Sequence, residues 1–364
     1  MNSAWRAAGA LIALSVIAAP AAAQEQPLPR YVPHHHVSGV LRSSGDRHMA
    51  RLMHAWEAAF RRYQPGIEFS EALHGTASGM YGLEMRTADV ALMGRPLNPF
   101  ERYGTYERSW VYPVQIEVAT GSVQTPGASP AYAIFVNTGN PLTKLTVKQL
   151  DGIFGAQRGG GWQALSWVES AARPASANIR TWRQLGIGGA LADKPIHVYG
   201  PPLLGAGAVS FFQARVLQGG AIWNEDLREY DNPATMLADL RRDPYGIAYA
   251  PLSYGNAGVK AIALSESATG PYVTLTQQTV ANRSYPLARP VYINYTIDDE
   301  RSEIANPRVD PKVDEFMRFV LSAQGQAIVA HDGTYLPLPA AVVRRQLLTL
   351  QSRGTPPEKA LLRE

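Results

Sequence analysis

The stretch VYGPPLLGAGAVSFFQARVL, residues 198–217, has the layout of an anion-binding loop but lacks the usual side chains. A short apolar strand at 196–199 is followed by a loop that contains Gly207, and a helix then begins. The unpaired backbone N–H groups at the start of a helix attract anions, and the helix dipole adds to that attraction. Residues 203–209 carry no hydroxyl and no positive charge. An anion at this loop would therefore be bound by the backbone alone.

Two earlier glycine loops are polar. A strand predicted at 37–41 runs into Ser43-Ser44-Gly45-Asp46, and a strand predicted at 67–73 is followed by Gly75-Thr76-Ala77-Ser78-Gly79. Ligands of open α/β sheets bind beyond the carboxyl ends of the strands, so these loops are the first candidates for a site. Thr76 and Ser78 have a second interpretation, because a hydroxyl here also caps the following short helix.

Length and composition indicate an exported globular protein. The chain has 364 residues, which suggests two domains, and 18% of them are charged. Residues 1–23 have one arginine, an apolar run and three alanines before Gln24, as in a signal peptide. There is no cysteine, which excludes disulfides and a lipid-modified cysteine. We expect a protein of the periplasm or the exterior, with no membrane span after cleavage.

The net charge of +4 is too small and too scattered to suggest a nucleic-acid partner, but it suits a small anionic ligand. The sequence has no G-x-S-x-G elbow, phosphate-binding P-loop or H-E-x-x-H motif, so we expect no enzyme. We expect no cofactor and no metal. Consecutive side chains of His34-His35-His36 point alternately to opposite faces in extended chain, and we interpret residues 24–36 as a surface lead-in.

The elements that must position the loops follow a β-α-β-α-β order. Spacing of apolar residues predicts helices over 48–63, with Asp46 as its cap, and over 145–154, with Thr146 as its cap. A further helix is predicted over 313–330, ending near Gly333. Residues 157–177 are rich in Gly, Ala, Ser and Pro and are interpreted as a surface insertion. Six aromatic residues are assigned to the core: Trp56, Trp182, Phe211, Phe212, Phe316 and Phe319.

Several segments, in this order along the chain, resemble the substrate-binding proteins of phosphate ABC transporters, which are type II periplasmic binding proteins. They are LRSSGDRHMARLMHAWEAAFRRYQPGIEF, TADVALMGRPL, AIFVNTGNPLTKLTVKQLDGIFG, IRTWRQLGIGGALADKPIHVYG, PYGIAYAPLSYGNAGVKAIALSE, SYPLARPVYINY and FMRFVLSAQGQAIVAHDGTYLPLP. The resemblance implies an α/β protein with two lobes, a hinge crossed twice and a ligand in the cleft between the lobes. We expect lobe 1 over 37–130 plus 262–345, lobe 2 over 131–261, and a C-terminal tail over 346–364.

The resemblance also implies an oxyanion site made of backbone N–H groups and hydroxyls from three loops. Carried over to this sequence, the site residues are Ser44, Gly45, Arg47, His48, Thr76, Ala77, Ser78, Arg95, Gly207 and Ala208. Gly94 stands where related chains carry a serine before the arginine. Ala206 and Ala208 stand where the family has hydroxyls, and Pro201 where it has an arginine. Each hydrogen bond lost from a bound anion costs about 1.5–3 kcal/mol. We therefore expect this site to bind phosphate more weakly than the usual site of the family.

Alternatives remain open for several of these residues. Arg47 either reaches the cleft or pairs with Asp46 or Glu71, and His48 either meets the ligand or faces solvent. Tyr249 and Tyr254 either approach the cleft or pack against the hinge. The preferred function is an exported binding protein for phosphate or another small oxyanion, which is a monomer and works with the permease of an ABC transporter. The alternative is a secreted sensor, interaction or surface protein that keeps the fold without high-affinity phosphate binding.

Overall fold

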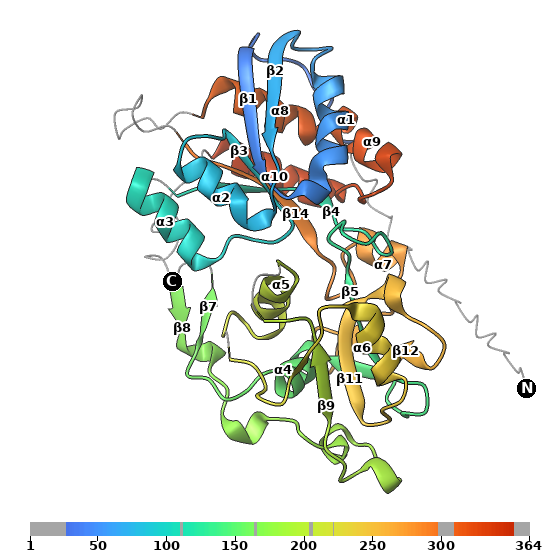
Figure 1. The fold of residues 1–364 in the computed structure, drawn as a ribbon. Coiled ribbons are helices and arrows are strands. Elements are labelled where there is room, and N and C mark those ends of the chain that lie inside the picture. Colours follow the sequence, from blue (N-terminus) through green and yellow to red (C-terminus); the bar gives the residue numbers. More distant parts are fainter. Residues whose placement is uncertain are drawn as a thin grey trace, which may run out of the picture.

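A computed structural model describes residues 27–352, except for 110–111, 164–165, 204–206, 221 and 298–308. The expected signal peptide, Ala206 and the part of the expected tail after 352 lie outside the described residues. The chain forms two α/β lobes, one above the other in Figure 1, as the resemblance implied. None of the helices in the described part combines the length and hydrophobicity that a membrane span requires.

The first lobe is built on a five-stranded sheet in the order β2-β1-β3-β14-β4. Strand β1 pairs in parallel with β2 and β3, whereas β14 is antiparallel to both β3 and β4. The strands are β1 (Ser38–Gly45), β2 (Gly66–Ala72), β3 (Val90–Met93), β4 (Val114–Thr120) and β14 (Pro290–Tyr295). The carboxyl ends of the three parallel strands therefore meet at one edge, which faces the second lobe (Figure 1).

Strand β1 is longer than the sequence suggested. The loop was expected to begin at Ser43, but Ser43 and Ser44 are buried and pair with β2 on one side and β3 on the other. A central strand flanked on both sides satisfies its backbone groups by continuing the ladder, so β1 ends only at Gly45. The carboxyl end of the strand is thereby placed next to Asp46.

Helices cover both faces of this sheet. They are η1 (Arg47–Met49), α1 (Ala50–Phe60), α2 (Thr76–Glu84), α3 (Pro99–Ser109), α8 (Pro311–Val320), α9 (Ala323–Asp332) and α10 (Ala340–Gln351). Trp56, Phe316 and Phe319 are fully buried in the core of this lobe, as predicted. The helix predicted over 313–330 is in fact two helices. The Ser322 hydroxyl accepts a hydrogen bond from Gly325 N at 3.2 Å and so begins α9 as its N-cap.

The lead-in segment packs on the first lobe. Tyr31 is buried in the core cluster, and its hydroxyl donates to Glu315 Oε2 at 2.7 Å. The other carboxylate oxygen of Glu315 accepts the backbone N–H groups of His34 and His35 at 2.9 and 2.8 Å. The side chains of His34, His35 and His36 are exposed, as expected for a surface segment.

The second lobe is built on a sheet in the order β10-β9-β11-β5-β12. Its strands are β5 (Tyr132–Asn137), β9 (His197–Gly200), β10 (Arg228–Glu229), β11 (Gly246–Pro251) and β12 (Val259–Ala261). The helices are α4 (Val147–Phe154), α5 (Gly207–Val216), α6 (Pro233–Leu240) and α7 (Gln277–Ala281), with short 3-10 turns η2 (Glu169–Ala171), η3 (Ala175–Ala177), η4 (Trp182–Leu185), η5 (Gly189–Leu191) and η6 (Leu252–Tyr254). Trp182, Phe211 and Phe212 lie in its core, as predicted, and Thr146 caps α4.

Two small sheets complete this lobe. Strand β6 (Lys144–Thr146) pairs with β13 (Ala263–Ser265), and β7 (Gly161–Gln163) pairs with β8 (Ser166–Val168). The second pair, β7 and β8, falls within residues 157–177. This segment was expected to be a surface insertion, but part of it is buried against the second lobe. Arg158 is buried against Asp151 of α4, with both guanidinium-carboxylate distances below 3 Å (2.6 and 2.8 Å), and Arg173 lies 3.4 Å from the same carboxylate. A buried carboxylate needs such partners, which explains why these arginines point inward.

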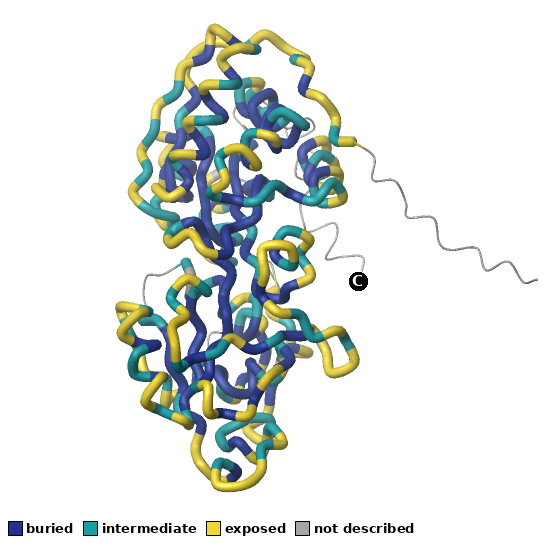
Figure 2. Tube along the Cα trace, turned by 90° about the vertical axis from the view of Figure 1, so that its right-hand side faces the viewer, coloured by how far each residue is buried: buried dark blue, intermediate teal, exposed yellow. Residues whose placement is uncertain are grey.

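The chain crosses between the lobes twice, at a narrow waist where the trace is buried (Figure 2). The first crossing runs from the end of β4 to the start of β5, and the second leads into β14. The two crossings are hydrogen-bonded to each other, from Gly121 N to Arg289 O at 2.6 Å and from Tyr132 N to Leu287 O at 3.3 Å. Four side chains before the second crossing, Leu264, Leu275, Val280 and Leu287, pack in the core of the second lobe. Residues 263–287 thus lie with the second lobe, although the expected division placed them in lobe 1.

Candidate anion-binding site

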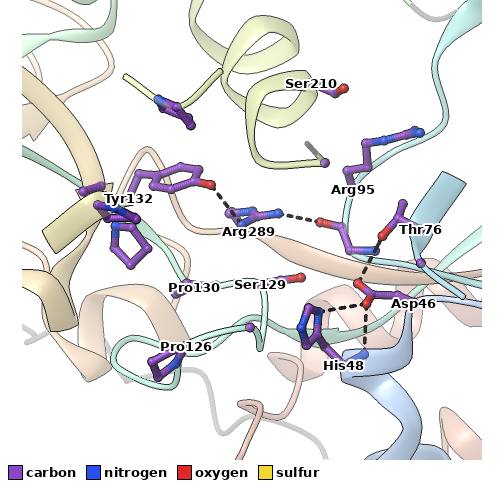
Figure 3. Close-up of a pocket in the computed structure, with 18 of the residues that line it drawn as sticks. Asp46, His48, Thr76, Arg95, Pro126, Ser129, Pro130, Tyr132, Ser210 and Arg289 are labelled. Carbon is purple, nitrogen blue, oxygen red and sulfur yellow. Dashed lines mark hydrogen bonds and ion pairs between the residues drawn. The ribbon is translucent and has the colours of Figure 1, made fainter. Parts of the chain in front are cut away.

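A pocket of about 640 Å³ lies between the lobes and is lined by both of them and by the crossings (Figure 3). The first lobe contributes residues that follow the carboxyl ends of β1, β2 and β3. The second lobe contributes the start of α5 and the end of β11. The lining residues used below are Asp46, Arg47, His48, Thr76, Ala77, Gly94, Arg95, Ser129, Tyr132, Pro201, Gly207, Ser210, Pro233, Met236, Tyr249, Pro251, Tyr254 and Arg289.

The Asp46 carboxylate holds two of the loops together. Its Oδ1 accepts the backbone N–H of His48 at 3.0 Å and lies 3.1 Å from His48 Nδ1, and its Oδ2 accepts the Thr76 hydroxyl at 3.1 Å. Asp46 is therefore the N-cap of the first helical turn, as predicted. Because this buried carboxylate already has three partners, it orders the loops after β1 and β2 relative to each other.

Six of the ten residues carried over from the resemblance line this pocket: Arg47, His48, Thr76, Ala77, Arg95 and Gly207. Three others are engaged elsewhere. The Ser44 hydroxyl donates to Gly79 O at 3.0 Å beneath α2, the Ser78 hydroxyl donates to Gly75 O at 2.8 Å, and Gly45 lies against the Leu92 carbonyl. The tenth residue, Ala208, is the second residue of α5, and its side chain is not among those that the structure describes.

The charge of Arg95 is neutralised within the first lobe. Its two terminal nitrogens are each 2.7 Å from a carboxylate oxygen of Glu101, in the first turn of α3. A bidentate pair of this kind fixes the direction of the guanidinium. Arg95 therefore lines the pocket, but it does not present an uncompensated charge. Arg47, in contrast, is exposed and makes no ion pair with a described residue, so neither Asp46 nor Glu71 pairs with it.

Arg289 supplies the buried cation of the site, and sequence reasoning missed it. Its residue exposure is only 6%, and its guanidinium donates to Gly94 O at 3.0 Å and to the Tyr132 hydroxyl at 3.4 Å (Figure 3). It lies over the rings of Tyr132 and Phe211, 5.2 and 5.4 Å from their centroids. Within the described chain no carboxylate pairs with it, and its Nε has no hydrogen-bond partner. A buried charge without a counterion is costly, and an anion in the pocket would remove that cost.

Helices α2 and α5 both begin at the pocket. Thr76 and Ala77 are the first residues of α2, and Gly207 is the first residue of α5. The first N–H groups of a helix have no partner inside the helix, so both helix starts offer donors to an anion. Gly75 precedes α2 with φ 131°, a conformation that favours glycine, and this lets the chain turn directly from β2 into α2.

Two further hydroxyls line the pocket that the sequence did not suggest. Ser129, on the first crossing, has φ 46°, and Ser210 lies on α5. A Cβ atom added to Gly94 would lie 2.4 Å from Ser129 Oγ and 2.8 Å from Asp46 Oδ2. Ser129 thus occupies the space that a side chain at position 94 would need, which explains why glycine stands there. Tyr249 and Tyr254 also line the pocket, and burial raises the pKa of the Tyr249 phenol.

A family model described as a PBP superfamily domain matches residues 18–324. The chain belongs to the PBP superfamily. This confirms the fold that the resemblance implied. A phosphate-binding protein PstS from Pseudomonas aeruginosa is 29% identical over 345 residues, which are 94% of this chain and 97% of that protein.

Two solved structures share the PBP superfamily fold. One is PstS from Borrelia burgdorferi, with a TM-score of 0.53 and 16% identity over 83% of this chain and all of that one (100%). The other is an ABC-type phosphate transport receptor from Vibrio cholerae, with a TM-score of 0.52 and 19% identity over 82% of this chain and 100% of that chain. At these identities the two structures show the fold alone. The ligand is inferred from the pocket.

Proposed function

We propose that this chain is the exported solute-binding component of an ABC transporter and holds phosphate or another small oxyanion in the pocket between its lobes. One observation carries the proposal: Arg289 is buried at the pocket, and no carboxylate of the described residues pairs with it. Around it lie the starts of α2 and α5 and the hydroxyls of Ser129 and Ser210, which are donors suited to the oxygens of such an anion. The relative from Pseudomonas aeruginosa, a phosphate-binding protein by name, supports the same ligand class.

The two crossings suit a hinge. They are hydrogen-bonded to each other, and Tyr132 and Arg289 stand at their ends. We propose that residues 37–130 together with the chain after 288 move as one body, and that 131–287 move as the other. An anion that contacts both bodies stabilises the closed arrangement. The closed form would be the one that docks on the permease, in the periplasm or outside the cell.

The pocket supports binding rather than catalysis. Asp89 and Asp243, which stand apart from other acids in the sequence, are both paired in the structure. Asp89 pairs with Arg42 at 2.7 Å, and Asp243 accepts from His197 at 2.7 Å and from the Tyr199 hydroxyl at 2.6 Å. Neither is among the described residues that line the pocket, and Asp46, a carboxylate that does line it, is engaged by His48 and Thr76 as a cap and a link between loops. We therefore propose that the chain is a binding protein.

Titration calorimetry with inorganic phosphate on Arg289→Gln tests this proposal. Each hydrogen bond to a charged group contributes about 1.5–3 kcal/mol, so the variant should bind phosphate about 10- to 100-fold more weakly. Arg318→Gln is the matched control, because Arg318 pairs with Asp314 at 2.7 Å on α8 and does not line the pocket. Equal affinities of Arg289→Gln and the unaltered chain would reject the proposed site.

The second candidate, a secreted sensor or interaction protein, is favoured by the loop before α5. Residues 203–209 provide no hydroxyl and no cation to an anion. If the unaltered protein shows neither heat nor a thermal shift with phosphate, arsenate, sulfate or molybdate, the transport role fails and this candidate replaces it.

A further inference from the structure

The two walls of the pocket differ in chemistry. On the side of the first lobe and the crossings lie Arg289, Ser129 and the first N–H groups of α2. On the side of the second lobe, the start of α5 and Ser210 are polar, and the other lining residues are mostly apolar or aromatic: Pro201, Pro233, Met236, Tyr249, Pro251 and Tyr254. Anion-binding groups therefore gather around Arg289 and the two helix starts, and the rest of the second-lobe lining offers mainly apolar surface that favours contact with carbon.

The size of the pocket exceeds what an inorganic oxyanion needs. Its volume of about 640 Å³ lies within the range of roughly 300–1,000 Å³ that is usual for organic small molecules. An inorganic oxyanion at Arg289 has only a handful of atoms and would leave the opposite wall uncovered.

One buried polar atom on the second wall has no partner. The Tyr249 hydroxyl is inaccessible and makes no hydrogen bond, while its ring stacks on Phe212 with centroids 4.0 Å apart. Buried polar atoms are normally paired, so this hydroxyl is a candidate partner for a polar group of the ligand. It belongs to the second lobe, whereas Arg289 Nε, another buried lining atom without a partner among the described residues, lies at the crossing.

We propose that the ligand is an organic phosphate. This inference rests on the proposed function. The phosphoryl group lies against Arg289 and the start of α2, and the organic substituent lies against the second-lobe wall around Met236 and Tyr254. The apolar contact contributes affinity in proportion to the area that it buries, and inorganic phosphate cannot supply it.

Calorimetry on the purified, ligand-stripped protein with phenyl phosphate and with inorganic phosphate tests the inference. Burial of most of one face of the phenyl ring should make phenyl phosphate bind about tenfold more tightly. Tyr254→Ala should remove much of that advantage, so that the ratio of the two affinities falls towards one. The matched control is Tyr272→Ala, which removes a half-buried tyrosine stacked under Lys144 and away from the pocket lining. It should leave both affinities unaltered.

The outcomes separate the two proposals. If inorganic phosphate binds as tightly as phenyl phosphate or more tightly, the organic substituent has no place in the pocket and this inference is overturned, while the anion site stands. If neither compound binds, the proposed function fails and the inference falls with it. A phenyl phosphate advantage that persists in Tyr254→Ala would also overturn the assignment of the substituent to this wall.

Discussion

The guanidinium of Arg289 lies 5.2 Å from the centroid of the Tyr132 ring, and these two residues stand on the two separate crossings between the lobes. Tyr132 begins β5, and Arg289 immediately precedes β14. The buried charge of the pocket is thus placed on the hinge itself. Under the proposed function, an anion bound there contacts the part of the chain that bends when the lobes close, and we expect binding and closure to be coupled.

The two arginines of the pocket should differ in their effect on binding. Arg95 is neutralised by Glu101, whereas Arg289 has no acidic partner in the described chain. We expect Arg95→Gln to weaken phosphate binding by less than about threefold, because a charge that is already paired contributes little to a further anion. Arg289→Gln should weaken it by at least about tenfold. Calorimetry on both variants makes the comparison, and a larger loss for Arg95→Gln would contradict it.

The close packing of the crossings predicts a stability effect at Gly121. A Cβ atom at this position would lie 1.9 Å from Ser129 O and 2.8 Å from Arg289 O. Gly121→Ala should therefore lower the free energy of unfolding by about 1–3 kcal/mol, as for other overpacked sites. Urea unfolding measures this loss. Gly188→Ala is the control, since a Cβ there meets nothing within 4 Å, and it should cost no stability. A Gly121→Ala protein as stable as the control would show that the crossings can move apart freely.

Some of the fold and of this site was predictable from the sequence because it is local. The loop from β2 into α2, the Asp46 cap and the Thr146 cap each depend on residues within a few positions of one another. The position of the loops at one edge of the sheet follows from the parallel order of the first strands.

Other parts of the site were not predictable from local pattern. Arg289 reaches the pocket only because β14 returns to the first sheet between β3 and β4, and nothing near it in the sequence marks it as a ligand. The ion pair between Arg95 and Glu101 forms because α3 begins at Pro99 and places Glu101 in its first turn. The break between α8 and α9 was missed because the apolar spacing continues across Ser322, whose cap overrides it.

Glu57 should make stability depend on pH. Burial, followed by the nearby charge of Glu71, raises its pKa from 4.5 to about 7. The folded chain then holds a proton that the unfolded chain releases, so stability is complete below pH 4.5 and declines as pH rises to about 7. Glu57→Gln should remove this decline and be more stable relative to the unaltered protein at pH 8 than at pH 4.5.

Urea unfolding at several pH values checks this. Glu68→Gln is the control, since Glu68 is an exposed carboxylate on β2, and it should leave the slope unchanged. The same stability difference between Glu57→Gln and the unaltered protein at both ends of the range would show that Glu57 is not the group responsible.

The most direct measurement is the melting temperature of the ligand-stripped protein with and without millimolar phosphate, beside arsenate, sulfate, molybdate and an organic phosphate. A ligand at about 100 times its dissociation constant adds roughly 2.7 kcal/mol to the free energy of unfolding, which is easily seen as a shift. We expect a clear upward shift with phosphate or with the organic phosphate, and its loss in Arg289→Gln. If none of these anions shifts the melting temperature, the pocket around Arg289 is not an anion site, and the central claim is contradicted.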